Sequence, residues 1–296
     1  MIHIQNVTKK FPNGLGIFDL SLQIPRGEAF GYLGPNGAGK STTIRTVMGF
    51  LRADTGVVQI DGRDCWREAA KLQEIIGYLP GEISFIEGMT GLEFLHLIAS
   101  MRKMRDNTRR DEMIERLNLD VKTDIRKMSK GMKQKVGIVA ALMHRPQVLI
   151  LDEPTSGLDP LMQKIFLELV LEEKQQGTTI FMSSHAFPEV ERICDRVGIL
   201  KDGHLVAVEN IAVLRAEQRK VFSVELANLS DISHLTDAGC VIVRTDRKEV
   251  EIEVQGTYDD FIQALAKCRV LRLNAHELNL EQLFMHYYSR KERFHS

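Results

Sequence analysis

Residues 34–41 read GPNGAGKS and fit the pattern G-x-x-x-x-G-K-[S/T]. The three glycines of this stretch permit a loop whose backbone N–H groups turn inward, because no Cβ stands in the way. Lys40 adds a cation, and Ser41 would place its hydroxyl on a phosphate-bound Mg²⁺. The stretch therefore predicts a phosphate-binding loop. Its predicted members are Gly34, Pro35, Asn36, Gly37, Ala38, Gly39, Lys40, Ser41 and Thr42.

The segments on either side of this loop support the prediction. EAFGYL (28–33) has the apolar pattern of a strand, and STTIRTVMGF (41–50) that of a helix whose N-terminal dipole favours negative charge. The alternative is a glycine-rich turn between strand and helix. The full pattern arises by chance in roughly one chain in a hundred of this length, which favours phosphate binding.

A second motif lies downstream in VLILDEPTSGLDP (148–160), where an apolar run ends in two acids. Ligands of parallel α/β sheets bind at the carboxyl ends of strands. Asp152 is therefore predicted to hold Mg²⁺, and Glu153 to polarise an attacking water. Alone, the pair is also typical of a polar turn after a strand; together with the phosphate loop it indicates nucleotide chemistry.

Composition excludes several classes of protein. The 296 residues are 44% hydrophobic and carry a net charge of −1, so no global field attracts nucleic acid or an anionic membrane. The four cysteines are scattered, which fits neither a disulfide framework nor a zinc site. We expect no signal peptide and no membrane-spanning helix, because no apolar run is long enough. In a membrane process, another chain would cross the bilayer.

The pattern along the chain predicts two domains. Residues 1–80 read as short strands, about 90–145 as amphipathic helices, and 148–210 as alternating strands and helices. From 214 the order becomes β-α-β-β-α-β, a split βαβ arrangement. We therefore predict an α/β domain over 1–213 and a small α+β domain, ferredoxin-like, over 214–296.

Several motifs together resemble the nucleotide-binding subunit of ABC (ATP-binding cassette) transporters. Besides the phosphate loop and LDEP, MSKGMKQK (128–135) resembles the family signature LSGGQ and SGLD (156–159) its D-loop. His185 stands where the family has its switch histidine, and Phe11 where it has an aromatic residue that stacks on adenine. The resemblance covers about residues 1–210.

The resemblance implies a fold, a reaction and partners. The fold would be the P-loop cassette, a mixed sheet core with a helical subdomain at about 82–145. ATP would be hydrolysed by Glu153, His185 and Lys40 with Mg²⁺. Two copies would sandwich two ATP molecules, with Ser129 and Gly131 meeting the γ-phosphate held by the opposite copy. A separately encoded permease would place the protein at the cytoplasmic face of the cell membrane, with no nucleic acid partner.

Three positions depart from the family pattern. After IGYLP the usual glutamine is replaced by Gly81 and Glu82, and we expect Glu82 to substitute as a metal ligand. In the signature, Lys130 replaces the first glycine and Met132 the glutamine. These departures, and NLEQLFMHYY at 279–288, resemble a branch of bacterial ABC exporters of the ABC-2 type whose ATPase is a separate chain.

Two alternatives to a transport ATPase stay open at this point. ABC ATPases that act on ribosomes usually fuse two cassettes, and those that act on DNA insert long coiled coils; this sequence contains neither feature. A regulatory module that binds ATP without turnover would not need Lys40, Asp152 and Glu153 together, although the altered residues 81 and 82 leave that alternative open. Co-purification with a membrane protein would indicate transport and co-purification with ribosomes or DNA the first alternative, whereas absence of phosphate release would indicate the regulatory module.

Overall fold

The computed structural model describes residues 1–216, 220–247, 249–254 and 258–277. The chain divides into two compact units, Met1–Ile211 and Ala212–Ser296. The division falls two residues before the predicted boundary, at the start of α8 (Ile211–Ala216). Each unit has a hydrophobic core of its own.

A six-stranded sheet forms the centre of the first unit, in the order β10-β9-β3-β8-β7-β6. All neighbouring pairs from β9 to β6 are parallel, and β10 joins β9 antiparallel. The continuous apolar runs AFGYL and VLILD become wholly buried strands, as expected where both faces of a sheet are covered. The strands are β3 (Ala29–Leu33), β6 (Ile76–Leu79), β7 (Val148–Asp152), β8 (Thr179–Ser184), β9 (Arg196–Lys201) and β10 (His204–Asn210).

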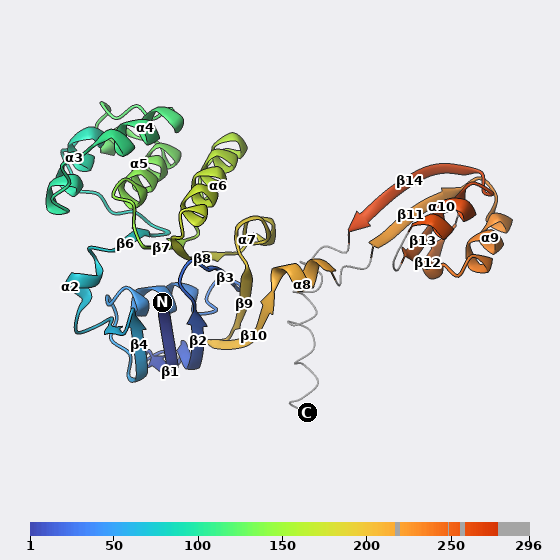
Figure 1. Ribbon diagram of the computed structural model, residues 1–296, viewed down its shortest axis with the longest axis horizontal. Coiled ribbons are helices and arrows are strands. Elements are labelled where there is room, and N and C mark those ends of the chain that lie inside the picture. The colour runs from blue at the N-terminus through green and yellow to red at the C-terminus, as the bar shows by residue number, and fades with distance from the viewer. Residues whose placement is uncertain (217–219, 248, 255–257, 278–296) are drawn as a thin grey trace. The chain divides into compact units, whose positions relative to one another are not determined.

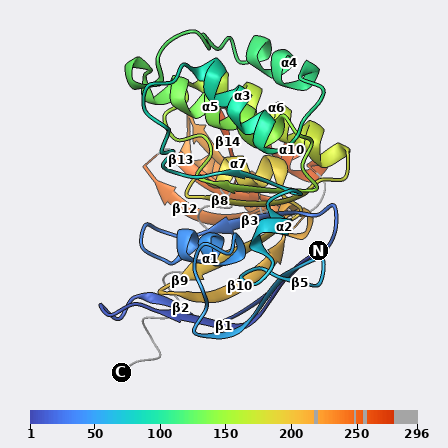
Figure 2. The ribbon, with the colours of Figure 1, turned by 90° about the vertical axis from the view of Figure 1, so that its left-hand side faces the viewer.

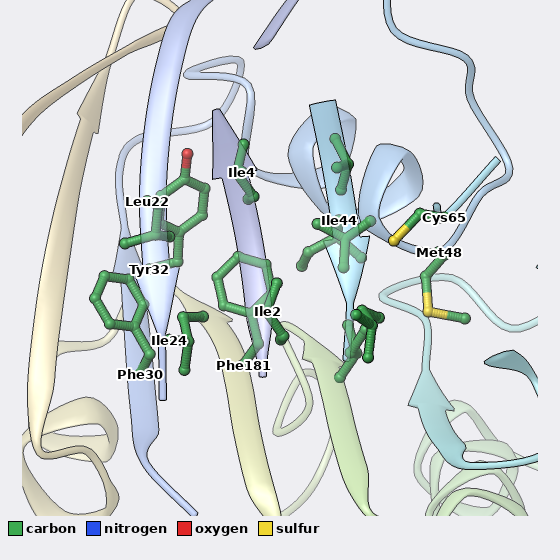
Figure 3. Packing of buried hydrophobic residues seen from close by; sticks show 14 of the residues in the cluster. Ile2, Ile4, Leu22, Ile24, Phe30, Tyr32, Ile44, Met48, Cys65 and Phe181 are labelled. Carbon is green, nitrogen blue, oxygen red and sulfur yellow. The ribbon is translucent and has the colours of Figure 1, made fainter. Parts of the chain in front are cut away.

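A second sheet, antiparallel in the order β2-β1-β4-β5, covers the first across a shared core. Its residues alternate between buried and exposed, with isoleucine and leucine inside. Figure 3 shows Ile2, Ile4, Leu22 and Ile24 of this sheet in one cluster with Phe30, Tyr32 and Phe181. The strands are β1 (Ile2–Lys10), β2 (Gly16–Ile24), β4 (Thr55–Ile60) and β5 (Arg63–Asp64).

Helices cover the remaining surfaces of this unit, and α3, α4 and α5 gather in a helical region beyond the edge strand β6 (Figures 1 and 2). Local chemistry sets their starts: Thr90 and Glu93 form a capping box, and Asp159 caps α6 ahead of Pro160. The helices are α1 (Lys40–Val47), α2 (Ala69–Leu72), α3 (Gly91–Met101), α4 (Thr108–Arg116), α5 (Lys130–Leu142), α6 (Pro160–Gln175) and α7 (Phe187–Ile193), with a 3₁₀ turn at Ile125–Lys127.

The second unit contains a four-stranded antiparallel sheet in the order β12-β13-β11-β14. Val224, Ile252 and Phe261 lie in its core, where the two helices cover one face. The elements follow the order β-α-β-β-α-β: β11 (Lys220–Leu226), α9 (Ile232–Asp237) after a 3₁₀ turn at Leu229–Asp231, β12 (Val241–Asp246), β13 (Glu249–Val254), α10 (Asp259–Leu265) and β14 (Val270–Glu277). The sequence motif at 279–288 lies outside the described residues.

Membrane spans are absent from the part of the chain described here, since no helix in it combines the length and hydrophobicity that crossing a bilayer requires.

Candidate functional site

Four neighbouring parallel strands of the six-stranded sheet bring the predicted motifs to one edge. Their order β3-β8-β7-β6 and their register place Leu33 beside Ser184, Ser183 beside Asp152, and Leu151 beside Leu79. The segments that follow these strands therefore lie next to one another, and they carry the phosphate loop, His185, Glu153 and Gly81. This is the edge at which parallel α/β sheets bind ligands.

The phosphate loop depends on glycine at defined positions. Gly37 and Gly39 have φ of 84° and 105°, a left-handed backbone that glycine adopts without strain. A Cβ at Gly39 would also lie 2.9 Å from Ile17 Cγ2. Helix α1 begins at the next residue, and its first turn contains no acidic residue. The positive end of the dipole of α1 therefore lies directly at the loop.

Lys40 is 5% exposed and its ammonium has three acceptors in reach. Nζ donates to the carbonyl oxygens of Gly34 at 2.6 Å and Pro35 at 3.3 Å, and lies 3.3 Å from Glu153 Oε1. Three acceptors match the three protons of an ammonium. The lysine therefore holds the loop in shape and connects it to the acid predicted to activate water.

A cavity of about 270 Å³ opens along this loop. Residues of the loop and Glu153 line one part of it, and Phe11, Asn13 and Leu15 of the β1–β2 connection line another. The connection is closed by a hydrogen bond from Phe11 N to Leu15 O of 2.8 Å. The predicted adenine-stacking residue thus shares the cavity with the loop. Sequence reasoning missed Asn13 and Leu15, whose only signal is their closeness to Phe11.

The two predicted acids, Asp152 and Glu153, differ in burial and in hydrogen bonding. Asp152 is 6% exposed, and its Oδ1 accepts a hydrogen bond of 2.6 Å from Ser183 Oγ. Glu153 has a left-handed backbone (φ 47°), so the chain turns sharply where β7 ends, and its N–H donates to Ser183 O at 3.2 Å. Ser183 therefore orients both acids. Sequence reasoning missed it, although a hydroxyl directly after the apolar run IFM (180–182) is a usable signal.

His185 follows β8 and reaches the same acid. Its Nδ1 lies 3.3 Å from Glu153 Oε2, and its side chain is 64% exposed. The turn that carries it is fixed by Ser184 Oγ, which accepts from Ala186 N at 2.9 Å and donates to Glu189 Oε2 at 3.0 Å. Lys40, Glu153 and His185, which lie in three different motifs and are predicted to act together, form one cluster.

The signature segment lies elsewhere on the first unit. Ser129 is exposed and caps α5, its Oγ accepting from Met132 N at 3.2 Å. A Cβ at Gly131 would lie 2.9 Å from Gly157 O, so the signature packs on the 156–159 turn. Neither Ser129 nor Gly131 is among the residues that line the cavity. Within one chain, then, the two predicted phosphate-binding segments stay apart.

The segment after β6 gives Gly81 and Glu82 different surroundings. A Cβ at Gly81 would lie 3.3 Å from Asp152 O, whereas Glu82 is exposed. Position 81 therefore lies against the metal-binding candidate Asp152. Over the described ranges, no group of three or more histidine, cysteine, aspartate or glutamate side chains converges on a metal position. Ser41 and Asp152 nevertheless offer the oxygen ligands that Mg²⁺ prefers.

Three comparisons, with family models, with curated proteins and with solved structures, agree on one family. Residues 17–156 match the family model described as ABC transporter. The chain is 33% identical, over 96% of its length and 97% of the relative's, to the linearmycin resistance ATP-binding protein LnrL of Bacillus subtilis (strain 168). It is 29% identical, over 96% and 95%, to the bacitracin transport ATP-binding protein BcrA of Enterococcus faecalis. A solved structure, the dimeric bacterial ABC transporter cassette MJ0796, superposes with a TM-score of 0.66 at 25% identity, covering 71% of this chain and 99% of that one.

Proposed function

Because the chain belongs to the ABC transporter family, as an ATP-binding subunit that hydrolyses ATP for transport, we propose that two of its copies close on two ATP molecules. One observation carries this proposal. The cavity is lined by the phosphate loop with Lys40 and by Glu153, which His185 contacts, whereas Ser129 is exposed at the start of α5 and does not line the cavity. A second copy supplies Ser129 to a nucleotide bound here, in an isologous dimer. The dimeric form of the related cassette supports this arrangement.

The nucleotide lies along the cavity in this proposal. Backbone N–H groups of the loop and of the first turn of α1 bind the β- and γ-phosphates, and Lys40 exchanges its loop carbonyls for phosphate oxygens. Ser41 and Thr42 lie at the same helix start. Phe11 stacks on adenine, supported by its place in the cavity wall. The charge of the triphosphate thus meets the positive end of a helix and a buried cation.

Ser41 and Asp152 would hold Mg²⁺, because a hydroxyl and a carboxylate fit its preference for oxygen ligands. When bound, Mg²⁺ neutralises charge on the phosphates. Glu82 is proposed as a further ligand, directly or through water. Ser183 keeps Asp152 in place by its 2.6 Å hydrogen bond.

The catalytic step falls to Glu153. Its carboxylate accepts a hydrogen bond from the attacking water and orients that water toward the γ-phosphate. His185, 3.3 Å from that carboxylate, fixes its direction and contacts the γ-phosphate. Lys40, the loop amides and the second copy's Ser129 and Gly131 stabilise the charge that develops on the transferred group.

We further propose a membrane setting for this ATPase. A separately encoded permease carries the substrate, and the helical region at about 82–145 transmits closure of the dimer to it. The protein then works at the cytoplasmic face of the cell membrane, without a nucleic acid partner. Export is the proposed direction, supported by the resistance and bacitracin transport functions in the names of two relatives.

The second unit is proposed to be a separate domain, beginning at about residue 214, with a ferredoxin-like fold. Its support is the element order β-α-β-β-α-β together with the strand order β12-β13-β11-β14.

The dimer is tested with Glu153→Gln, which keeps the shape of the side chain and removes its negative charge. We expect phosphate release to fall by about a hundredfold or more while ATP binding persists, because only the water-orienting group changes. Sedimentation should show dimers with ATP and monomers with ADP. A crystal of this variant with Mg²⁺ and ATP should place Ser129 of one copy at the γ-phosphate of the other; isolated molecules, or unchanged turnover, would refute the proposal.

A further inference from the structure

Lys130, the residue that departs from the family signature, is held in a defined position. It is the first residue of α5, and its Nζ donates to Ser156 Oγ at 3.0 Å. Its aliphatic stem lies on Gly157, where an added Cβ would come within 3.0 Å of Lys130 Cγ and Cδ. Lys130 is therefore exposed beside Ser129, and the next residue is the partly buried Gly131.

The charge of Lys130 is placed unfavourably for α5 alone. The first turn of the helix contains no acidic residue, and Lys133 follows in the same turn. Cations beside the positive end of a helix are unfavourable, because the helix dipole repels them. Within the described ranges, the hydrogen bond of this ammonium goes to a neutral hydroxyl rather than to a carboxylate. A strongly anionic group nearby would offset that cost.

We propose that Lys130 binds the phosphates of the ATP held by the second copy, as an additional cation acting across the dimer. This inference rests on the proposed function, which places its neighbours Ser129 and Gly131 at the γ-phosphate. The contact to Ser156 keeps the side chain extended over the 156–159 turn before the dimer closes, and the ammonium then exchanges the hydroxyl for a phosphate oxygen. A charged hydrogen bond to phosphate is stronger than the neutral one it replaces.

The alternative role for Lys130 is a tether between α5 and the 156–159 turn, and two variants separate the roles. Lys130→Met removes the charge and keeps the stem on Gly157, whereas Ser156→Ala removes the tether and keeps the charge. Lys130→Arg retains the charge and serves as the rescue. All three are made in the Glu153→Gln chain, so that ATP is not consumed.

The measurement is ATP-dependent dimerisation by sedimentation at several salt concentrations. We expect Lys130→Met to weaken the dimer by about tenfold or more, the value of a charged hydrogen bond. Its affinity should also depend less on salt, because two cations leave the interface. Lys130→Arg and Ser156→Ala should stay within about threefold of the parent, the range of weak exposed contacts.

A second measurement establishes that the contact is made across the dimer. At protein concentrations too low for dimers, the affinity for a fluorescent ATP analogue should be equal in the Glu153→Gln parent and in its Lys130→Met variant. A weaker monomer affinity would assign Lys130 to its own chain's nucleotide and overturn the proposal. Equal losses for Lys130→Met and Ser156→Ala, or no loss for either, would also overturn it. If the Glu153→Gln parent itself fails to dimerise with ATP, the proposed function falls, and this inference with it.

Discussion

Glu153 Oε2 lies 3.3 Å from His185 Nδ1, although β7 and β8, which end before these residues, are separated in sequence by helix α6. The other oxygen of the same carboxylate lies 3.3 Å from Lys40 Nζ. The histidine is 64% exposed, so the pair adds little to folding stability. The contacts instead fix the orientation of the Glu153 carboxylate, because Lys40 contacts one of its oxygens and His185 the other.

His185→Ala should therefore damage catalysis and not the fold. We expect phosphate release at saturating ATP to fall by about a hundredfold, the usual contribution of a group that acts in proton transfer or orients one that does. ATP affinity and the unfolding midpoint should stay close to those of the parent. Steady-state phosphate release and thermal unfolding check these expectations. A loss of stability with unchanged turnover would instead make His185 a structural residue.

Glu82 can be tested through the metal requirement. If Glu82 binds Mg²⁺, Glu82→Gln should raise the Mg²⁺ concentration for half-maximal turnover by about tenfold, the scale of lost metal-site contacts. Glu87→Gln is the matched control, since Glu87 is exposed in the same segment after β6. Titration of Mg²⁺ at constant ATP gives the comparison. Equal curves for the two variants would show that Glu82 is not a ligand and leave Asp152, beside Gly81, as the only predicted carboxylate ligand.

Two arginines of α4 allow a controlled test of what fixes the helical region to α6. Arg109 pairs at 2.5 Å with Glu173, which is 1% exposed, whereas Arg116 pairs at 2.7 Å with the half-exposed Glu172. Arg109→Met leaves a buried carboxylate without its cation and should lower the free energy of unfolding by about 3–5 kcal/mol. Arg116→Met should cost about 1 kcal/mol or less.

Denaturant unfolding followed by circular dichroism measures both variants. Similar costs for the two would mean that water reaches Glu173, contrary to its burial. A double variant, Arg109→Met with Glu173→Leu, should recover most of the loss, because neither partner of a buried pair is then left alone.

His144 predicts how stability changes with pH. Burial, and then the charge of Arg102, lowers the pKa of this imidazole to about 4. The unfolded chain takes up the proton near pH 6.5, and the folded chain only near 4. The contribution of His144 to the free energy of unfolding is therefore fully present above about pH 6.5. It falls by about 1–3 kcal/mol as the pH decreases from there toward 4.

His144→Gln removes the titrating group and offers an amide to Ile76 O, which His144 Nε2 contacts at 3.1 Å. The difference in unfolding free energy between pH 7.5 and pH 5 should therefore shrink in the variant. Denaturant unfolding at the two pH values measures it. An unchanged difference would assign the acid sensitivity to other groups.

Much of the site follows from local sequence, and the misses share one cause. The phosphate loop and LDEP can be recognised in the sequence because the functional residues of each motif are adjacent in the chain. Ser183 was missed because its partner Asp152 lies far away in the sequence, and Asn13 because it meets the phosphate loop only across the cavity. The place of Gly81 beside Asp152 was missed for the same reason.

The amino-acid order by itself determined the loop at 34–42, the apolar strands ahead of it and ahead of Asp152, and the change of pattern near residue 214. These features depend on backbone freedom and hydrophobic period, which neighbouring residues decide among themselves. The family resemblance implied that Lys40, Glu153 and His185 act together and that Ser129 does not join them in the same chain, but only the tertiary structure gives the contacts between the three and the cavity that Ser129 does not line. The strand order β3-β8-β7-β6 decides which segments become neighbours. This order is not a local property, because strands far apart in the sequence must pair to form a parallel sheet that is buried on both faces.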